Sequence, residues 1–152
     1  MSDNSLVMNG NKLSFAFSKA ERLCAVSAVE QLYKEGNTFL RHPLKINFLR
    51  DSVPMEGDFL FPKVLFVVPK RSFKKSVDRN LIKRRMREAY RLHKHLFFEL
   101  ATSNTAQSPL MYVSFFYVAK EILPYQSIEK KIVAAITILA EGTEGEYLKS
   151  KK

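Results

Sequence analysis

The sequence predicts an α+β domain in which helices pack against one small β-sheet. Apolar residues recur at helical spacing in some segments, and alternate with polar residues or form short continuous runs in others. A length of 152 residues with 46% hydrophobic side chains suits one domain with its own core. No internal repeat or interdomain linker is visible.

The first half of the chain is predicted to contain a helix and one or two strands. The helix spans residues 26–35, where apolar side chains recur at helical spacing, and Gly36 favours its end. Residues 44–49 alternate between apolar and polar, as in a half-buried strand, and a further short strand is possible near residues 38–41. Residues 53–58 are predicted to form a turn.

The second half is predicted to alternate strands with longer helices. Residues 63–68 form an almost continuous apolar strand. A helix follows from Ser76, its expected N-cap, to about Leu100. An aromatic-rich strand over residues 111–118 and a helix over residues 124–140 complete the domain.

Both ends of the chain are predicted to lie outside this domain, which spans residues 19–141. Residues 1–18 are expected to be a flexible arm, and residues 142–152, rich in Gly, Glu and Lys, a disordered tail. No apolar run approaches the roughly 20 residues of a membrane-spanning helix, and the N-terminus has no apolar signal region. We therefore expect no membrane partner.

The single cysteine, Cys24, excludes an intramolecular disulfide and a multi-cysteine zinc site. It fits a reducing cytoplasm and is expected to be a small buried apolar residue. The five glycines are scattered, so no glycine-rich phosphate loop is present.

The positive charge is confined to one window. The chain carries a net charge of +10, and residues 63–94 contain twelve basic residues against Asp78 and Glu88 alone, which accounts for the whole excess. A pI of about 9.8 is typical of nucleic-acid-binding proteins. Membrane surfaces and acidic proteins are alternative partners for such a charge.

A helical wheel of residues 76–100 separates two stripes. The apolar stripe includes Ile82, Met86 and Ala89, together with His93, and should pack on the sheet. The neighbouring stripe is basic, with side chains about 6 Å apart along the axis, a spacing comparable to that of successive phosphates. The basic stripe comprises Arg79, Asn80, Lys83, Arg84, Arg87, Arg91 and Lys94. A merely solvated face or a membrane-surface helix are the weaker interpretations.

The residues from Val68 to Arg91 resemble the signature of the bacterial ribonuclease P protein subunit. In that family a strand and a basic turn lead into a helix reading R-N-x-x-K-R-x-x-R-E-x-x-R, the RNR motif. The matching positions here are Arg79, Asn80, Lys83, Arg84, Arg87, Glu88 and Arg91. Leu81 departs from the arginine common at that position, and Arg85 is a candidate to replace the lost contact.

The resemblance implies a fold with α-β-β-β-α-β-α order and a left-handed βαβ crossover, of the ribosomal protein S5 domain 2-like type. It also implies a function: the family's proteins assist a catalytic RNA that removes the 5′ leader of precursor tRNA. That RNA subunit and precursor tRNA are the expected partners, with no obligate protein partner. Mg²⁺ is the expected cofactor, held by RNA and substrate rather than by the protein.

The resemblance also assigns residues. The expected RNA-binding residues are Lys70, Arg71, Lys74, Lys75, Arg79, Asn80, Lys83, Arg84, Arg87 and Arg91. The expected leader-binding residues, in a cleft between the first helix and the sheet, are Val29, Tyr33, Lys45 and Asn47. Simple core packing is an equally weighted interpretation of Tyr33, and the strand face that lines the cleft stays open.

No catalytic or metal-binding residue is expected in the protein. The acids of the basic window are ten residues apart, and no histidine pairs with Cys24 or an acid at a telling spacing. His93 is expected to lie at the edge of the core. Two other functions stay in view: a ribosomal or other structural RNA-binding protein without a role in cleavage, and a DNA-binding helix-turn-helix regulator.

Overall fold

The computed structural model describes residues 5–8, 11–14, 17, 19–50, 61–97 and 110–141. Its elements are β1 (Ser5–Met8), β2 (Asn11–Ser14), the 3₁₀ helix η1 (Lys19–Glu21), α1 (Val26–Glu35), β3 (Asn37–Arg41), β4 (Leu44–Arg50), β5 (Lys63–Val67), α2 (Ser76–His93), β6 (Leu110–Tyr117) and α4 (Tyr125–Glu141). From α1 onward the order is α-β-β-β-α-β-α, which confirms the expected fold.

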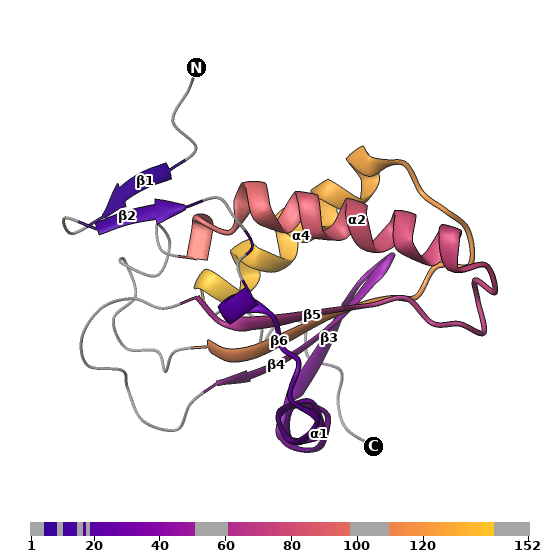
Figure 1. Cartoon of the computed structure of the whole chain (residues 1–152), viewed down its shortest axis with the longest axis horizontal. Helices are drawn as coiled ribbons and strands as arrows, with labels where there is room; N and C mark the ends of the chain where they lie inside the picture. The colour runs from indigo at the N-terminus through magenta and orange to yellow at the C-terminus, as the bar shows by residue number, and fades with distance from the viewer. Residues whose placement is uncertain are drawn as a thin grey trace.

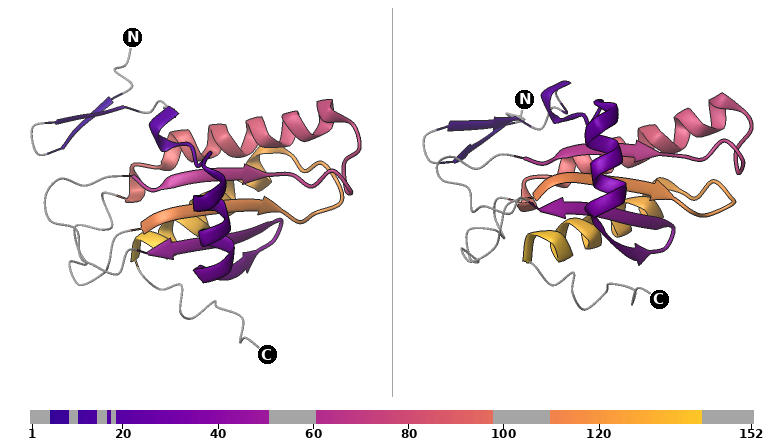
Figure 2. Two further views of the ribbon diagram at one scale, coloured as in Figure 1. Left: turned by 60° about the horizontal axis from the view of Figure 1, so that its bottom comes forward. Right: turned by 90° about the horizontal axis from the view of Figure 1, so that it is seen from below.

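The main sheet has four strands in the order β3-β4-β6-β5. Its pairs are antiparallel except for β5 and β6, which run parallel and are joined through α2. In the right-hand view of Figure 2, β5 lies above β6, both strands run to the right and α2 lies behind them. The connection is therefore the left-handed crossover that the resemblance implies, against the usual right-handed rule.

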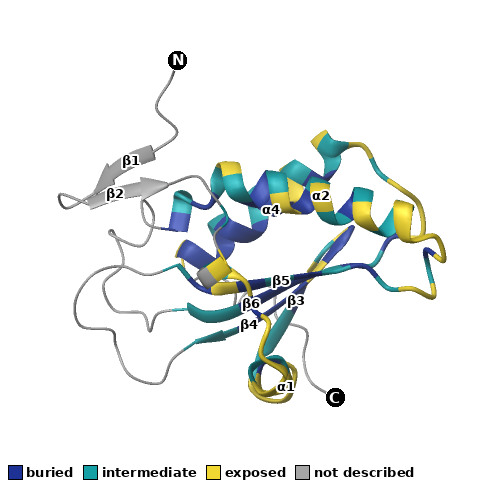
Figure 3. Cartoon of the chain, viewed as in Figure 1, coloured by how far each residue is buried: buried dark blue, intermediate teal, exposed yellow. Residues whose placement is uncertain are grey.

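The sheet separates two unequal layers. Helices α2 and α4 cover one face and α1 alone crosses the other (Figure 1). Leu44, Ile46 and Phe48 of β4 are buried in a core cluster with side chains of α2 and α4. The buried sides of these two helices face the sheet (Figure 3). Because strand side chains alternate, Lys45 and Asn47 lie on the α1 face.

Helix α1 ends where a close backbone contact requires glycine. The Gly36 N–H donates to the Leu32 carbonyl at 2.8 Å. A Cβ at residue 36 would lie 2.3 Å from the Leu32 oxygen and 2.7 Å from the Phe48 oxygen. Glycine thus allows the chain to turn directly from α1 into β3.

Helix α2 begins and ends differently from the prediction. Its N-cap is Lys75 with an extended backbone and no side-chain cap, so Ser76 is the first helical residue and not the expected cap. The helix ends at His93, whereas the pattern predicted an end near Leu100; residues 94 and 95 form a turn. Leu100 itself lies outside the described residues.

Other predictions concern the ends and one loop. The expected arm contains β1 and β2, which pair antiparallel with each other. Its flexibility stays a prediction, and the turn at residues 53–58 and the tail at residues 142–152 lie outside the described residues. In the part of the chain that the structure describes, no helix is long and apolar enough to span a bilayer.

Candidate nucleic-acid interface

Three cations in the middle of α2 form a surface that we call the open ridge: Lys83, Arg84 and Arg87. Arg84 and Arg87 are exposed and Lys83 is half-buried. None of the three has a hydrogen-bond or ion-pair partner among the described residues. Asn80, one turn earlier, is exposed and equally without a side-chain partner there. These groups are available for phosphates and sugars.

A second group of free cations precedes the helix. We call it the basic turn: Lys70, Arg71, Lys74 and Lys75. All four side chains are exposed, and none has an ion-pair partner within the described ranges. The basic turn follows β5 and leads directly into α2, so it extends the charge of the open ridge toward one end of the sheet (Figure 1).

Arg79, the first arginine of the motif, holds the basic turn. Its Nη1 donates to the Phe73 carbonyl at 2.8 Å and to the Lys74 carbonyl at 2.9 Å. Both bonds come from one nitrogen, so Nε and Nη2 of the guanidinium keep their donors. Arg79 therefore combines a structural role with the predicted RNA contact.

Arg91, the last arginine of the motif, is paired within the helix. Its Nη2 and Nε donate to Glu88 Oε1 and Oε2 at 2.5 and 3.2 Å. The hydrogen bond from Arg91 lowers the pKa of the Glu88 carboxyl and raises the pKa of Arg91 itself. An RNA phosphate would therefore have to compete with Glu88 for this guanidinium.

Two basic residues of the window are structural. Arg85 Nη1 donates to the Leu123 carbonyl at 2.5 Å and ties α2 to the segment before α4. This contact argues against Arg85 replacing the arginine missing at Leu81. Lys94 is only 2% exposed, and its Nζ bonds Glu21 Oε1 at 2.7 Å. Its place on an exposed basic stripe was wrong, because the ammonium is buried against Glu21 and lies 4.8 Å from the centre of the Phe61 ring.

Polar side chains line the α1 face of the sheet, and we call them the polar row: Tyr33, Thr38, Asn47 and Ser114. The Tyr33 hydroxyl lies 2.9 Å from Ser114 Oγ, and Thr38 Oγ1 donates to Asn47 Oδ1. Asn47 pairs in register with both Thr38 and Ser114, so the row crosses three strands. Thr38 and Ser114 were missed because only the strand register reveals them.

The predicted leader-binding residues meet on this same face. Tyr33 is 46% exposed, so it is not the packed core residue of the alternative interpretation. Lys45 is exposed and shares the face of Asn47, while Val29 of α1 is half-buried. Lys45 and Asn47 therefore lie on the side of the sheet that α1 crosses, and their binding of a leader stays a prediction.

The remaining candidates for chemistry have other surroundings. His93 Nε2 lies 3.1 Å from Glu129 Oε2 between α2 and α4, as expected of a histidine at the edge of the core. Tyr125 donates to the same oxygen; burial and this bond raise its pKa to about 12. Cys24 is exposed, so its expected burial was wrong. The described residues contain no group of three or more potential metal ligands.

Comparison with known proteins places this arrangement in one family. The sequence model of the Ribonuclease P family matches residues 17–136. The ribonuclease P protein component of Porphyromonas gingivalis is 28% identical over 138 residues, which cover 91% of this chain and 96% of the relative. That of Chlorobaculum tepidum is 38% identical over 90 residues, covering 59% of this chain and 58% of the relative.

Solved structures share the fold. The ribonuclease P protein of Staphylococcus aureus superposes with a TM-score of 0.58 at 16% identity, covering 80% of this chain and 96% of that one. The protein from Thermotoga maritima gives a TM-score of 0.57 at 17% identity, covering 77% and 96%. With the family match over most of its length, the chain belongs to the ribonuclease P protein family.

Proposed function

We propose that this chain is the protein subunit of ribonuclease P and binds the catalytic RNA through the open ridge and the basic turn. The observation that carries the proposal is a set of cations, on a sheet-anchored helix and in the turn before it, that have no partner among the described residues. Solubility does not require cations concentrated in one segment, whereas a folded RNA presents phosphates at similar spacing. Arg79, Asn80 and Arg91 extend the same surface at its two ends.

We further propose that the polar row receives the single-stranded 5′ leader of precursor tRNA. Tyr33 offers an exposed aromatic face on which a base can stack. Thr38 is half-buried, and its hydroxyl oxygen can accept a hydrogen bond from a base edge, while the buried Asn47 and Ser114 hold Thr38 and Tyr33 in place. Lys45, exposed beside them, supplies charge for the leader's phosphates.

The two acids of the basic window do not fit a shared magnesium site, and the described residues contain no cluster of three or more potential metal ligands. Asp78 and Glu88 are ten residues apart on α2, about 15 Å along the helix axis. Glu88 already accepts two bonds from Arg91. We therefore propose that Mg²⁺ is held by the RNA subunit and the substrate, where it supplies the hydrolytic chemistry, while the protein positions the leader. The site of action is the cytoplasm.

Reconstitution tests this function. The purified chain is added to the ribonuclease P RNA of the same organism at a Mg²⁺ concentration too low for the RNA alone, and precursor tRNA cleavage is measured. We expect cleavage at the mature 5′ end to be restored. Binding to ribosomal RNA without any stimulation of cleavage would contradict the proposal and favour a structural RNA-binding protein.

A further inference from the structure

The segment that precedes α1 lies along the β5 edge of the sheet, and we call residues 19–23 the strap. It consists of η1 and the two residues after it, and it leads within two further residues into α1 (Figure 2). The Leu23 N–H donates to the Val64 carbonyl at 2.9 Å, and Arg22 forms a parallel bridge with Val64. Leu23 is 3% exposed. The strap therefore continues the sheet by one short pairing beside the start of β5.

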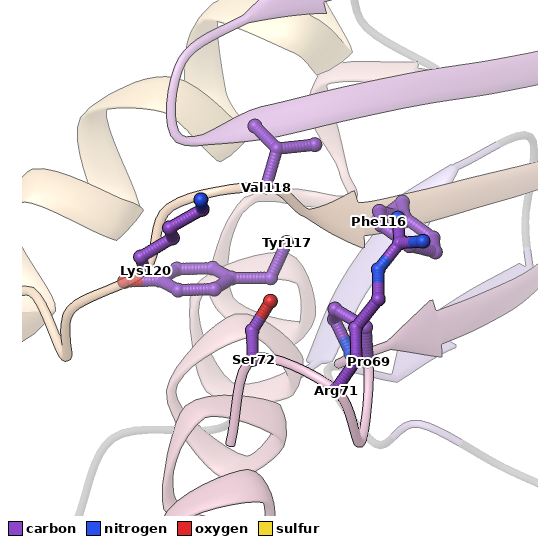
Figure 4. A pocket seen from close by; sticks show the side chains of 7 residues that line it. All are labelled: Pro69, Arg71, Ser72, Phe116, Tyr117, Val118 and Lys120. Carbon is purple, nitrogen blue, oxygen red and sulfur yellow. The ribbon is translucent and has the colours of Figure 1, made fainter.

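The strap lies far along β5 from the turn that leads into α2. The cavity of about 480 Å³ shown in Figure 4 lies beside that turn, and Arg71 of the basic turn is among its lining residues. The cavity thus adjoins the proposed RNA-binding surface. The strap carries no residue of the open ridge, the basic turn or the polar row, so its contacts need a different explanation.

Two contacts hold this segment to the end of α2. The Glu21 carboxylate accepts a bond from Lys94 Nζ at 2.7 Å, with 13% of the Glu21 side chain and 3% of the Lys94 side chain exposed. Phe17, two residues before the strap, packs edge-on against Tyr90 of α2 with the ring centroids 5.7 Å apart. A charge-assisted hydrogen bond has a defined geometry, and the aromatic pair adds apolar burial. The strap is therefore fixed relative to α2.

Helix α1 is packed unevenly along its length. Leu32 is its one buried residue and lies near the C-terminal end. The bond of the Tyr33 hydroxyl to β6 and the close backbone contact at Gly36 hold the same end. At the other end Val26 is 72% exposed, and the Ala25 N-cap makes no side-chain cap bond. The first turn of α1 thus depends on the strap for its anchor.

We propose that the strap positions the first half of α1 on the sheet, with Glu21 and Lys94 as its positioning residues. Because the C-terminal end of α1 has its own contacts, a shift of the strap tilts the helix about that end. The tilt moves half-buried Val29 and changes the space between α1 and the polar row. The ion pair thereby couples α2 to the leader-facing side of the sheet. The inference rests on the proposed function for the identity of the strand bound there.

Hydrogen exchange of the full chain tests the anchor directly. In Glu21→Gln the amides in the first half of α1 should exchange at least about ten-fold faster than in the wild type, because local opening of a loosely packed element becomes easier. The amides of α4 should change by a smaller factor. Glu129→Gln removes the same charge from the ion pair of α4 with His93 and is the matched control. It should keep the wild-type ratio between the exchange rates of the two helices.

The single cysteine of the chain supplies an independent readout. Cys24 is exposed and lies between the strap and α1. A spin label on Cys24 should become more mobile in Glu21→Gln and in Phe17→Ala, and should keep its mobility in Glu129→Gln. Phe17→Ala removes the aromatic contact without leaving a buried charge unpaired, so it tests the anchor even if Glu21→Gln does not fold.

The reconstituted holoenzyme separates positioning from a general loss of stability. Folded Glu21→Gln should raise KM for a precursor with a long leader by at least about three-fold, since small misplacements in a positioned site are costly. The kcat, the RNA-subunit affinity and the KM for a precursor with a very short leader should stay as in the wild type. A general loss of stability would instead lower the folded fraction and reduce all activities together.

The outcomes distinguish this inference from the proposed function. Wild-type exchange in α1 and wild-type label mobility in folded Glu21→Gln and Phe17→Ala would overturn the inference, and so would an unchanged KM for the long leader despite a loosened α1. An α1 that is loosened in both variants, in a chain whose wild type fails to stimulate cleavage, would support the anchoring by the strap and reject the proposed function alone.

Discussion

Helix α2 and the residue that follows it, Lys94, carry two kinds of cation that the sequence does not distinguish. Those of the open ridge have no partner among the described residues. The others, which we call the engaged set, each bind a protein group; they are Arg79, Arg85, Arg91 and Lys94. The comparison teaches that a local charge excess has two uses here. Part of it binds the protein to itself, and only the rest is fully available to RNA.

The largest effect is expected from Lys94, the most buried cation of the engaged set. Lys94→Met leaves the Glu21 carboxylate, itself 13% exposed, without its ammonium partner. Removing one partner of a buried ion pair costs about 3–5 kcal/mol. We expect a corresponding fall in the free energy of unfolding, measured by urea denaturation, with normal RNA affinity for the folded fraction. Unchanged stability would show that the pair is not structural.

Removing the charges of the open ridge should lower RNA affinity and leave the stability of the protein unchanged, the reverse of the result expected for Lys94→Met. In the triple variant Lys83→Gln, Arg84→Gln and Arg87→Gln, affinity for the RNA subunit should fall about 100-fold, since each charge-assisted contact is worth one or more kcal/mol. The melting temperature should stay within about two degrees of the wild type, because no described partner is lost. Filter binding and thermal melting measure the two quantities. A large loss of stability would place these residues in the engaged set.

Arg85 tests the engaged set at a smaller scale. Arg85→Gln removes the donor to the Leu123 carbonyl, and we expect a loss of about 1–2 kcal/mol of stability. RNA-subunit affinity should change less than three-fold in the same protein. A variant with wild-type stability and strongly reduced affinity would instead show that Arg85 replaces the arginine missing at Leu81.

The smallest effect is expected at Glu88. Glu88→Gln replaces the ion pair with Arg91 by a weaker hydrogen bond and removes a negative charge from the proposed RNA-binding surface. Affinity for the RNA subunit should rise by about two- to five-fold, with little change in stability, because exposed ion pairs contribute about 0–1 kcal/mol. Weaker RNA binding in this variant would mean that Glu88 positions Arg91 for RNA rather than competing for it.

The sequence predicted the elements of the fold well, because periodicity is local. The segment at residues 26–35 was identified as a helix, and α1 has those bounds. The crossover hand came only from the resemblance, since no local pattern encodes it. The length of α2 was overestimated, because apolar residues continue at helical spacing past His93 while the backbone turns at residues 94 and 95.

The site was predicted less completely, because partners come from distant segments. A helical wheel predicts the direction in which Lys94 points. It cannot predict the ion pair of Lys94 with Glu21, which lies 73 residues earlier in the sequence. The same holds for Tyr33 and Ser114, which are 81 residues apart and meet only through the sheet. The sequence thus predicted which residue types form the interface. It did not predict which of the cations bind protein groups and which stay available to RNA.

The salt dependence of RNA-subunit binding tests the central claim most directly. Each phosphate contact contributes about 0.7–0.9 to the slope of log affinity against log salt. We predict that the open-ridge triple variant lowers this slope by about two to three, whereas a control with the same charge change at exposed Lys19, Lys130 and Lys131 keeps the wild-type slope. Equal slopes for the two triple variants would contradict it.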